Sequence, residues 1–223
     1  MRILVIIPAH NEAQNIAAVV VGVKARGLDA LVVDDGSSDS TGALAREHGA
    51  QVLTHTVKQG KGQSLREGFQ FAVWNQYDGV ITMDGDGQHA VADLDGFLEK
   101  ISEKPTSIIC GSRMAYPKGM PFIRRVTNRI MSDWISRICR QTIPDTQCGY
   151  RYISCTILRN IQIAAKDFEI ETEVLVEASK QGYPIFSVTV QTIYGNEKSK
   201  INPFKDTLRF FGYILREMRR PRA

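Results

Sequence analysis

A regular alternation of short apolar runs and amphipathic segments constrains the fold of this chain more than any other feature. The apolar runs are nearly continuous in valine, isoleucine and leucine, which is typical of strands buried on both faces of a parallel sheet. We therefore predict an α/β fold, with a Rossmann-like, mostly parallel sheet and helices on both faces. The predicted strands are 2–7, 30–34, 50–55, 79–83 and 107–111, and the predicted helices are 12–25, 36–47, 60–74 and 91–101.

The second half of the chain is less regular. Amphipathic helices are predicted at 122–140 and 204–220, a further helix at 168–181 and a strand at 186–194. The 223 residues suffice for a sizeable core. No apolar run approaches the roughly 18 to 20 residues of a membrane span. The short apolar stretch at the N-terminus is interpreted as a strand and not as a signal peptide.

The charge distribution and the cysteine content indicate which partners and ligands to expect. The net charge is +4, but segments 118–140 and 200–223 each carry a net +5, so the remainder is acidic. Basic amphipathic segments of this kind favour contact with an anionic membrane surface. Nucleic-acid binding is not expected, because no nucleic-acid motif is present. The four cysteines lack the spacing of a metal site and are interpreted as reduced thiols of a cytosolic protein.

Polar loops follow the first four predicted strands: PAHNE, DDGSSDS, KQGKG and DGDGQ. Ligands of parallel sheets bind at the carboxyl ends of the strands, so the sequence predicts one site to which four loops contribute.

The DGDGQ loop contains two carboxylates one residue apart, Asp84 and Asp86. Like charges this close are costly unless a cation lies between them. Mg²⁺ commonly takes one or two carboxylates together with substrate phosphates, and Gln88 offers a third oxygen. For such a short motif taken alone, a solvated turn that caps the next helix is an equally good interpretation.

Three other interpretations of these loops fit less well. An EF-hand loop would need glycine at the position of His89 and glutamate at that of Asp95. A phosphatase-type aspartyl nucleophile would be followed two positions later by a hydroxyl residue, where Gln88 stands. GKGQSL lacks the third glycine of a dinucleotide fingerprint and follows the third strand instead of the first.

Seven segments occur in a recognisable order: VIIPAHNE, VVDDGSSDST, GKGQSLREGF, ITMDGDGQH, GSR, DTQCGYR and EIETEVLVEASKQGY. Together they resemble the family-2 inverting glycosyltransferases, and more narrowly the dolichyl- or polyprenyl-phosphate mannose and glucose synthases. The resemblance covers nearly the whole chain. It implies a nucleotide-diphospho-sugar transferase fold, with a catalytic domain over 1–195 and a basic loop and amphipathic helix over 196–223.

The resemblance implies a donor site and a metal site. The residues similar to those that grip the base and ribose are Pro8, His10, Glu12 and Asp35. Asp39 is expected to cap a helix, and Lys61 either meets a phosphate or is a solvated charge. Asp84, Asp86 and Gln88 match a metal-binding DxDxQ motif for Mg²⁺ or Mn²⁺, with Gly85 in contact with substrate. Asp86 would then be catalytic, because the ion stabilises the leaving nucleoside diphosphate.

The expected acceptor is a lipid phosphate. Because a phosphate monoester is largely ionised at pH 7, it needs cations to position it and no strong base. The candidates are Arg113 and Arg151, as catalytic residues, and Ser199 with Lys200. Those synthases usually carry an arginine before a GESK-like loop, whereas this chain has TIYGNEKSKIN, in which Lys198 replaces the charge. If a base is needed, Glu171 or His89 is the candidate.

The sequence thus predicts a metal-dependent hexosyltransferase that binds a nucleotide-sugar donor and works at the cytoplasmic face of a membrane as a peripheral protein. Two alternatives stay open: transfer to a sugar hydroxyl, and a nucleotide-sugar-binding protein without turnover. The donor base and sugar, the choice between Mg²⁺ and Mn²⁺, the acceptor length and the oligomeric state are also left open.

Overall fold

A computed structural model describes residues 1–115, 117, 120–164 and 169–191. Ser199, Lys200 and the predicted helix 204–220 lie outside the described residues. Within the described ranges, seven strands form one sheet in the order β3-β2-β1-β4-β6-β5-β7. The strands are β1 (Ile3–Ala9), β2 (Asp29–Asp34), β3 (Gln51–Thr54), β4 (Gly79–Thr82), β5 (Ile108–Ser112), β6 (Arg151–Ser154) and β7 (Ile185–Thr189). The predicted mostly parallel sheet is confirmed: only β6 runs antiparallel to its neighbours, β4 and β5.

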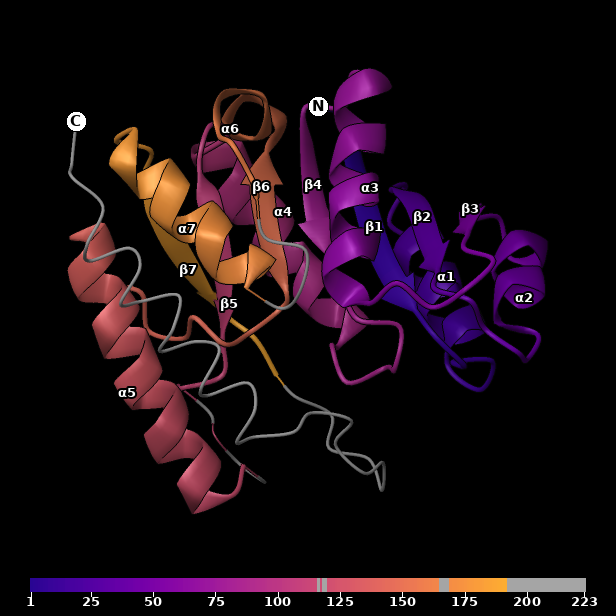
Figure 1. Ribbon diagram of the computed structural model, residues 1–223, viewed down its shortest axis with the longest axis horizontal. Helices are drawn as coiled ribbons and strands as arrows, with labels where there is room; N and C mark the ends of the chain where they lie inside the picture. The colour runs from indigo at the N-terminus through magenta and orange to yellow at the C-terminus, as the bar shows by residue number, and fades with distance from the viewer. Residues whose placement is uncertain (116, 118–119, 165–168, 192–223) are drawn as a thin grey trace.

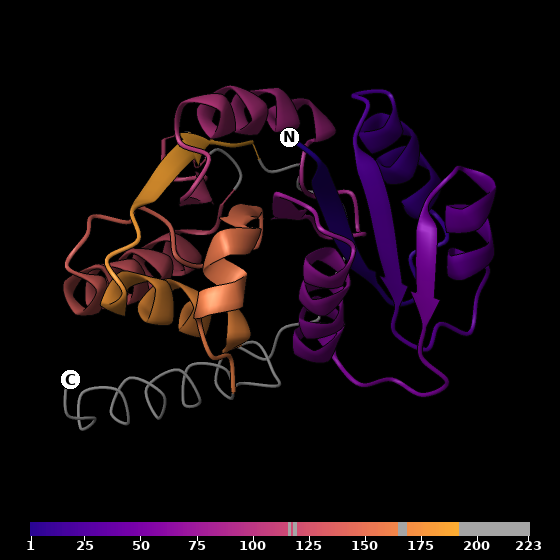
Figure 2. The ribbon, with the colours of Figure 1, turned by 90° about the horizontal axis from the view of Figure 1, so that it is seen from above.

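Helices cover both faces of the sheet, as predicted (Figures 1 and 2). One face carries α1 (Ile16–Lys24), α2 (Thr41–Glu47) and α4 (Leu94–Glu103), with the short helix η1 (Val91–Asp93) before α4. The other carries α3 (Lys61–Trp74), α5 (Phe122–Cys139), α6 (Cys155–Asn160) and α7 (Ile170–Lys180). Among the described residues, no helix is both long enough and apolar enough to cross a membrane.

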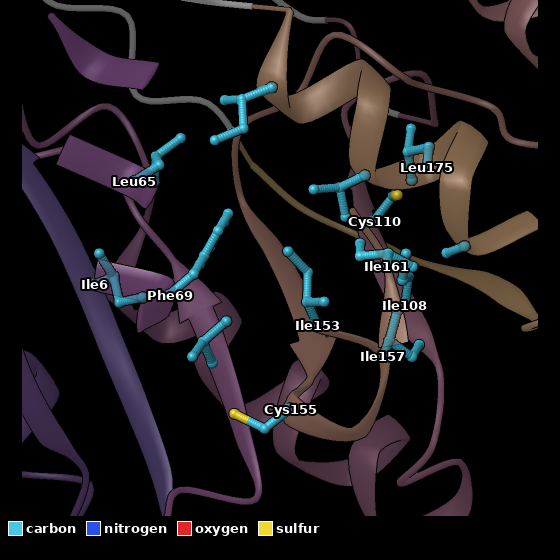
Figure 3. Packing of buried hydrophobic residues seen from close by; sticks show 14 of the residues in the cluster. Ile6, Leu65, Phe69, Ile108, Cys110, Ile153, Cys155, Ile157, Ile161 and Leu175 are labelled. Carbon is cyan, nitrogen blue, oxygen red and sulfur yellow. The ribbon is translucent and has the colours of Figure 1, made fainter. Parts of the chain in front are cut away.

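The alternation of side chains along the strands gives each face its own core. In β1, Leu4 and Ile6 point into the cluster beneath α3, whereas Val5 and Ile7 point into the cluster beneath α1. Figure 3 shows Ile6 beside Leu65 and Phe69 of α3, with residues of β5, β6, α6 and α7 in the same cluster. A strand buried on both faces needs apolar residues at every position, which explains the continuous run ILVII.

Several elements differ from the sequence-based prediction. Strand β6 and helix α6 were not predicted, because RYIS is short and begins with an arginine. Helix α1 begins four residues late: the Glu12 carbonyl accepts from the amides of Asn15 and Ile16 in a turn. The last predicted strand, 186–194, is observed at Ile185–Thr189, and 192–194 lie outside the described residues.

Candidate active site

The loops after β1, β2, β3 and β4 meet at one edge of the sheet, because these four strands are parallel neighbours. Hydrogen bonds join the loops directly. The amide of Asp35 donates to the carbonyl of Ala9 at 2.8 Å. Nδ1 of His10 lies 2.9 Å from the carbonyl oxygen of Asp35. Pro8, in β1, is half-buried. The four predicted contributors therefore lie at the same edge of the sheet.

The acidic turn 84–88 packs tightly against the end of β1. A Cβ placed on Gly85 would lie 3.1 Å from the Cβ of Ala9, so a side chain there would push the turn away from the strand. Gly87 has φ of +75°, a conformation that glycine adopts without strain. The amide of Gln88 donates to Oδ1 of Asp86 at 2.9 Å. The glycines on either side of Asp86 thus keep its carboxylate at the carboxyl edge of the sheet.

Lys61, the first residue of α3, lies between two carboxylates. Its Nζ is 2.6 Å from Oδ1 of Asp84 and 3.1 Å from Oε1 of Glu171, in the first turn of α7. Burial alone would raise the pKa of Asp84, but the Lys61 ammonium overrides it and lowers that pKa to about 2. A Cβ on Gly149 would lie 2.9 Å from Lys61 Nζ and 3.0 Å from Glu171 Oε1. A residue with a side chain at 149 would therefore displace this ion pair.

Asp86 lies in surroundings that disfavour its charge. Burial raises its pKa, and the nearby charges of Asp84 and Glu12 act in the same direction, although the Gln88 amide opposes them. A divalent cation would reverse this balance, so the donor set fits a hard ion with oxygen ligands. In the described part of the chain, no three His, Cys, Asp or Glu side chains form a ready-made metal site. Mg²⁺ sites built from one or two carboxylates and substrate phosphates do not require one.

His89 supports the acidic turn from beneath. Its Nδ1 accepts from the amide of Asp84 at 3.0 Å, and its ring stacks on Tyr150 with centroids 4.9 Å apart. Burial lowers the pKa of the ring. A neutral imidazole whose Nδ1 accepts a hydrogen bond carries its proton on Nε2. In this arrangement His89 has no free lone pair for a base, so of the two candidates the geometry favours Glu171.

Arg113 is buried beside the same site. Its Nε and one terminal nitrogen bind the buried Asp145 at 2.8 and 2.9 Å, and its backbone amide reaches the same carboxylate. The guanidinium also acts through its charge on Asp84, whose pKa it helps to lower. Asp145 was not among the candidates; its position within DTQCGYR was the available signal. The pairing fixes the guanidinium of Arg113 close to the acidic turn.

The structure corrects the prediction for Arg151. This side chain is 2% exposed, and its guanidinium donates to the carbonyls of Cys148, Thr146 and Glu171. These contacts hold the start of β6 and the start of α7. Arg151 is therefore engaged inside the protein instead of facing an acceptor phosphate.

In the structure, the carboxylates of Asp35 and Asp39 both accept hydrogen bonds from other groups of the protein. The Asp35 carboxylate accepts from His55 and from the amides of Gln59 and Gly60. A carboxylate has about four acceptor positions, so at most one is left for a nucleotide. Asp39 was expected to be the N-cap of a helix, but Ser40 is the N-cap of α2. The Asp39 carboxylate accepts from the amide of Thr41, the first residue of that helix. His55 was not among the candidates, and no local pattern in the sequence marked it.

A mostly parallel sheet with an acidic turn at its carboxyl edge fits the A-type fold of glycosyltransferases. The chain belongs to the family described as Glycosyl transferase family 2, whose model matches residues 4–162. It is 32% identical over 221 residues to Glycosyltransferase AglJ of Haloferax volcanii, covering 98% of this chain and 71% of that protein.

Two further comparisons agree. The chain is 30% identical over 204 residues to the polyprenol monophosphomannose synthase of Mycolicibacterium smegmatis, covering 85% of this chain and 76% of the other. The fold is similar to that of glucosyl-3-phosphoglycerate synthase from Mycobacterium tuberculosis, solved with Mn²⁺, UDP and glucosyl-3-phosphoglycerate. The TM-score is 0.69 at 16% identity, over 97% of this chain and 78% of that one.

Proposed function

We propose that this glycosyltransferase moves a hexose from a nucleotide sugar to a polyprenyl-phosphate acceptor with the help of Mg²⁺ or Mn²⁺. The observation that carries the proposal is the meeting of Asp84, Asp86, Glu12 and Lys61 at the carboxyl edge of the sheet. The names of the relatives support the acceptor: one is a polyprenol monophosphomannose synthase. The similar glucosyl-3-phosphoglycerate synthase was solved with Mn²⁺ and UDP bound, which supports the donor and the ion.

Each residue of the site then has a defined task. Asp84, Asp86 and Gln88 would hold the ion with the donor diphosphate, and Gly85, between the two aspartates, would lie against the substrate. When bound, the ion offsets the charge that develops on the leaving nucleoside diphosphate. Lys61, now paired with Asp84, turns to a donor phosphate. The residues that surround the nucleoside are Pro8, His10, Glu12 and the remaining acceptor position of Asp35.

The acceptor side needs fixed positive charge. Arg113 supplies it within the described residues, because Asp145 holds the guanidinium beside the acidic turn. Ser199 and Lys200, outside those residues, are proposed to complete it. An ionised phosphate then attacks the sugar without a protein base. A hydroxyl acceptor is the second candidate, favoured by one observation: the Glu171 carboxylate lies in the same site, 3.1 Å from Lys61.

Transfer can be measured with purified protein, polyprenyl phosphate in liposomes, and labelled GDP-mannose or UDP-hexoses added one at a time. We expect label to move into the organic phase with one of these donors, to stop with EDTA and to resume with Mg²⁺ or Mn²⁺. Metal-dependent donor binding without label in the lipid would rule out the phosphate acceptor. Transfer that resists EDTA would rule out the metal.

The peripheral membrane contact is proposed to use α5 and the basic segment 196–223. Helix α5 exposes an apolar stripe that begins with two adjacent residues, Phe122 at 72% and Ile123 at 79% exposed, and continues at spacings of three to four residues. The other members of the stripe are Val126, Ile130 and Trp134. Three arginines, at 124, 125 and 129, lie on the same helix and suit anionic headgroups. This contact would bring the site to the cytoplasmic face of the membrane, where the acceptor lies.

Charging the stripe tests this contact. We expect the double variant Phe122→Asp, Ile130→Asp to bind anionic phosphatidylglycerol vesicles about tenfold less tightly than the parent protein in a flotation assay. Val21→Asp is the matched control, because Val21 is also an exposed apolar residue on a helix, but on α1. Equal binding by the double variant and the control would exclude a role for α5.

A further inference from the structure

His55, the residue after β3, is buried between two carboxylates from different elements. Its Nδ1 lies 2.7 Å from Oδ1 of Asp35, in the loop after β2, and its Nε2 lies 2.9 Å from Oε2 of Glu67 in α3. Gln63 donates its side-chain amide to the other Glu67 oxygen at 2.9 Å. The imidazole is therefore held at both nitrogens, and one of its partners is itself fixed.

This arrangement determines the protonation of the ring. Ionised carboxylates only accept hydrogen bonds, so each ring nitrogen must carry a proton to bind its partner. Burial opposes that charge, but Asp35 and Glu67 outweigh it and raise the pKa of His55. In the described part of the chain, these two carboxylates are the charged groups that act on the ring. The result is a buried carboxylate–imidazolium–carboxylate unit.

The unit is connected to the donor site through Asp35. The same carboxylate accepts from the backbone amides of Gln59 at 2.7 Å and Gly60 at 2.8 Å. Gly60 has φ of +97° and precedes the first residue of α3, Lys61, which reaches Asp84. A continuous set of contacts thus runs from Glu67 through His55 and Asp35 to the residues that place Lys61.

We propose that His55, held between Asp35 and Glu67, is a positioning residue that fixes the segment 59–61 for binding of the donor diphosphate. His55 does not touch the reacting atoms; it orients the Asp35 carboxylate, which in turn orients two amides and the start of α3. A shift of the segment by about 1 Å is enough to lower activity considerably. The inference rests on the proposed donor site at this edge of the sheet.

The direction of the pH dependence follows from the same geometry. Because the folded state raises the pKa of His55, its contribution is fully present below the ordinary histidine pKa and is lost as the pH rises through the raised value. Deprotonation leaves a lone pair facing a carboxylate, which releases either Asp35 or Glu67. The segment 59–61 should then loosen above the pKa of His55.

Three variants separate the two sides of the unit. Glu67→Gln keeps the shape of the side chain and removes one of the two charges. His55→Asn places an amide nitrogen near the position of Nδ1 and keeps the Asp35 contact, whereas His55→Gln reaches the position of Nε2 and loses it. His48→Gln is the control, because the ring of His48 binds the carbonyl of Leu44 at the end of its own helix.

The first measurement uses NMR on the protein without nucleotide. We expect both ring nitrogens of His55 to be protonated at pH 7, and the amides of Gln59 and Gly60 to be protected from exchange. The protection of these two amides from exchange should fall about tenfold in His55→Gln and by a smaller factor in His55→Asn. A neutral His55 at pH 7, or equal protection of both amides in all variants, would overturn the proposal.

The second measurement is the affinity for UDP and GDP against pH. For whichever nucleotide binds, we expect His55→Gln to raise its Kd about tenfold and the midpoint of the pH dependence to fall by about one pH unit in Glu67→Gln. An unchanged midpoint would overturn the proposal, since a purely structural histidine would lower stability without moving it. If neither nucleotide binds the parent protein, the proposed donor site fails, and the amide protection still decides whether His55 positions the segment.

Discussion

Asp86→Asn is expected to lower kcat for sugar transfer by about 10²- to 10³-fold while leaving the protein folded. The variant keeps the size of the side chain and its place beside the Gln88 amide, but removes the charge proposed to hold the ion. Because burial, Asp84 and Glu12 raise the pKa of Asp86, its ionised form opposes folding, so loss of the charge should not lower the urea midpoint. Steady-state transfer assays measure kcat, and Mn²⁺ titration in the presence of nucleotide measures the affinity for the ion.

Asp95→Asn serves as the matched control for Asp86. Asp95 is an acidic residue of α4 whose carboxylate pairs with Arg26 at 2.8 Å. We expect its variant to transfer sugar at the parent rate. If Asp86→Asn also kept the parent rate and its affinity for Mn²⁺, the proposed metal site would be wrong.

Arg151→Met is expected to lower the free energy of unfolding by about 3 to 5 kcal/mol. Methionine fills much of the same volume but leaves three carbonyls, those of Cys148, Thr146 and Glu171, without their donor. Urea unfolding followed by circular dichroism measures the change, with comparison of midpoints and slopes. The effect on transfer should follow the loss of folded protein.

Arg159→Met separates this effect from the general loss of an arginine. Arg159 is exposed in α6, and we expect a change within about 0.5 kcal/mol. The sequence-based interpretation of Arg151 would regain support from the opposite pattern: a parent-like urea midpoint with weaker binding of the lipid phosphate. The structure predicts against that pattern, because the guanidinium is buried and donates to three backbone carbonyls.

Much of the fold followed from local patterns. The continuous apolar runs of β1, β2 and β4 report burial on both faces, and the polar residues after each run report the carboxyl edge where those strands end. Strand β6 escaped prediction because it has four residues and no such run, and because its antiparallel place between β4 and β5 depends on pairing with segments far away in the chain. Its buried arginine, Arg151, was interpreted as a residue that positions an acceptor phosphate.

The candidate site also has features that the sequence predicted and features that only the structure showed. The sequence by itself determined the family, the sheet with its polar edge, and the pair Asp84 and Asp86 on a glycine-rich turn, because these are properties of short contiguous segments. Only the tertiary structure decided how the polar groups are partnered within the protein: carbonyls accept from Arg151, Asp145 holds Arg113, and Asp35 accepts from His55 and two amides. The physical reason is that a charged side chain acquires its role from its partners, and these partners come from distant elements that only the folded sheet brings together.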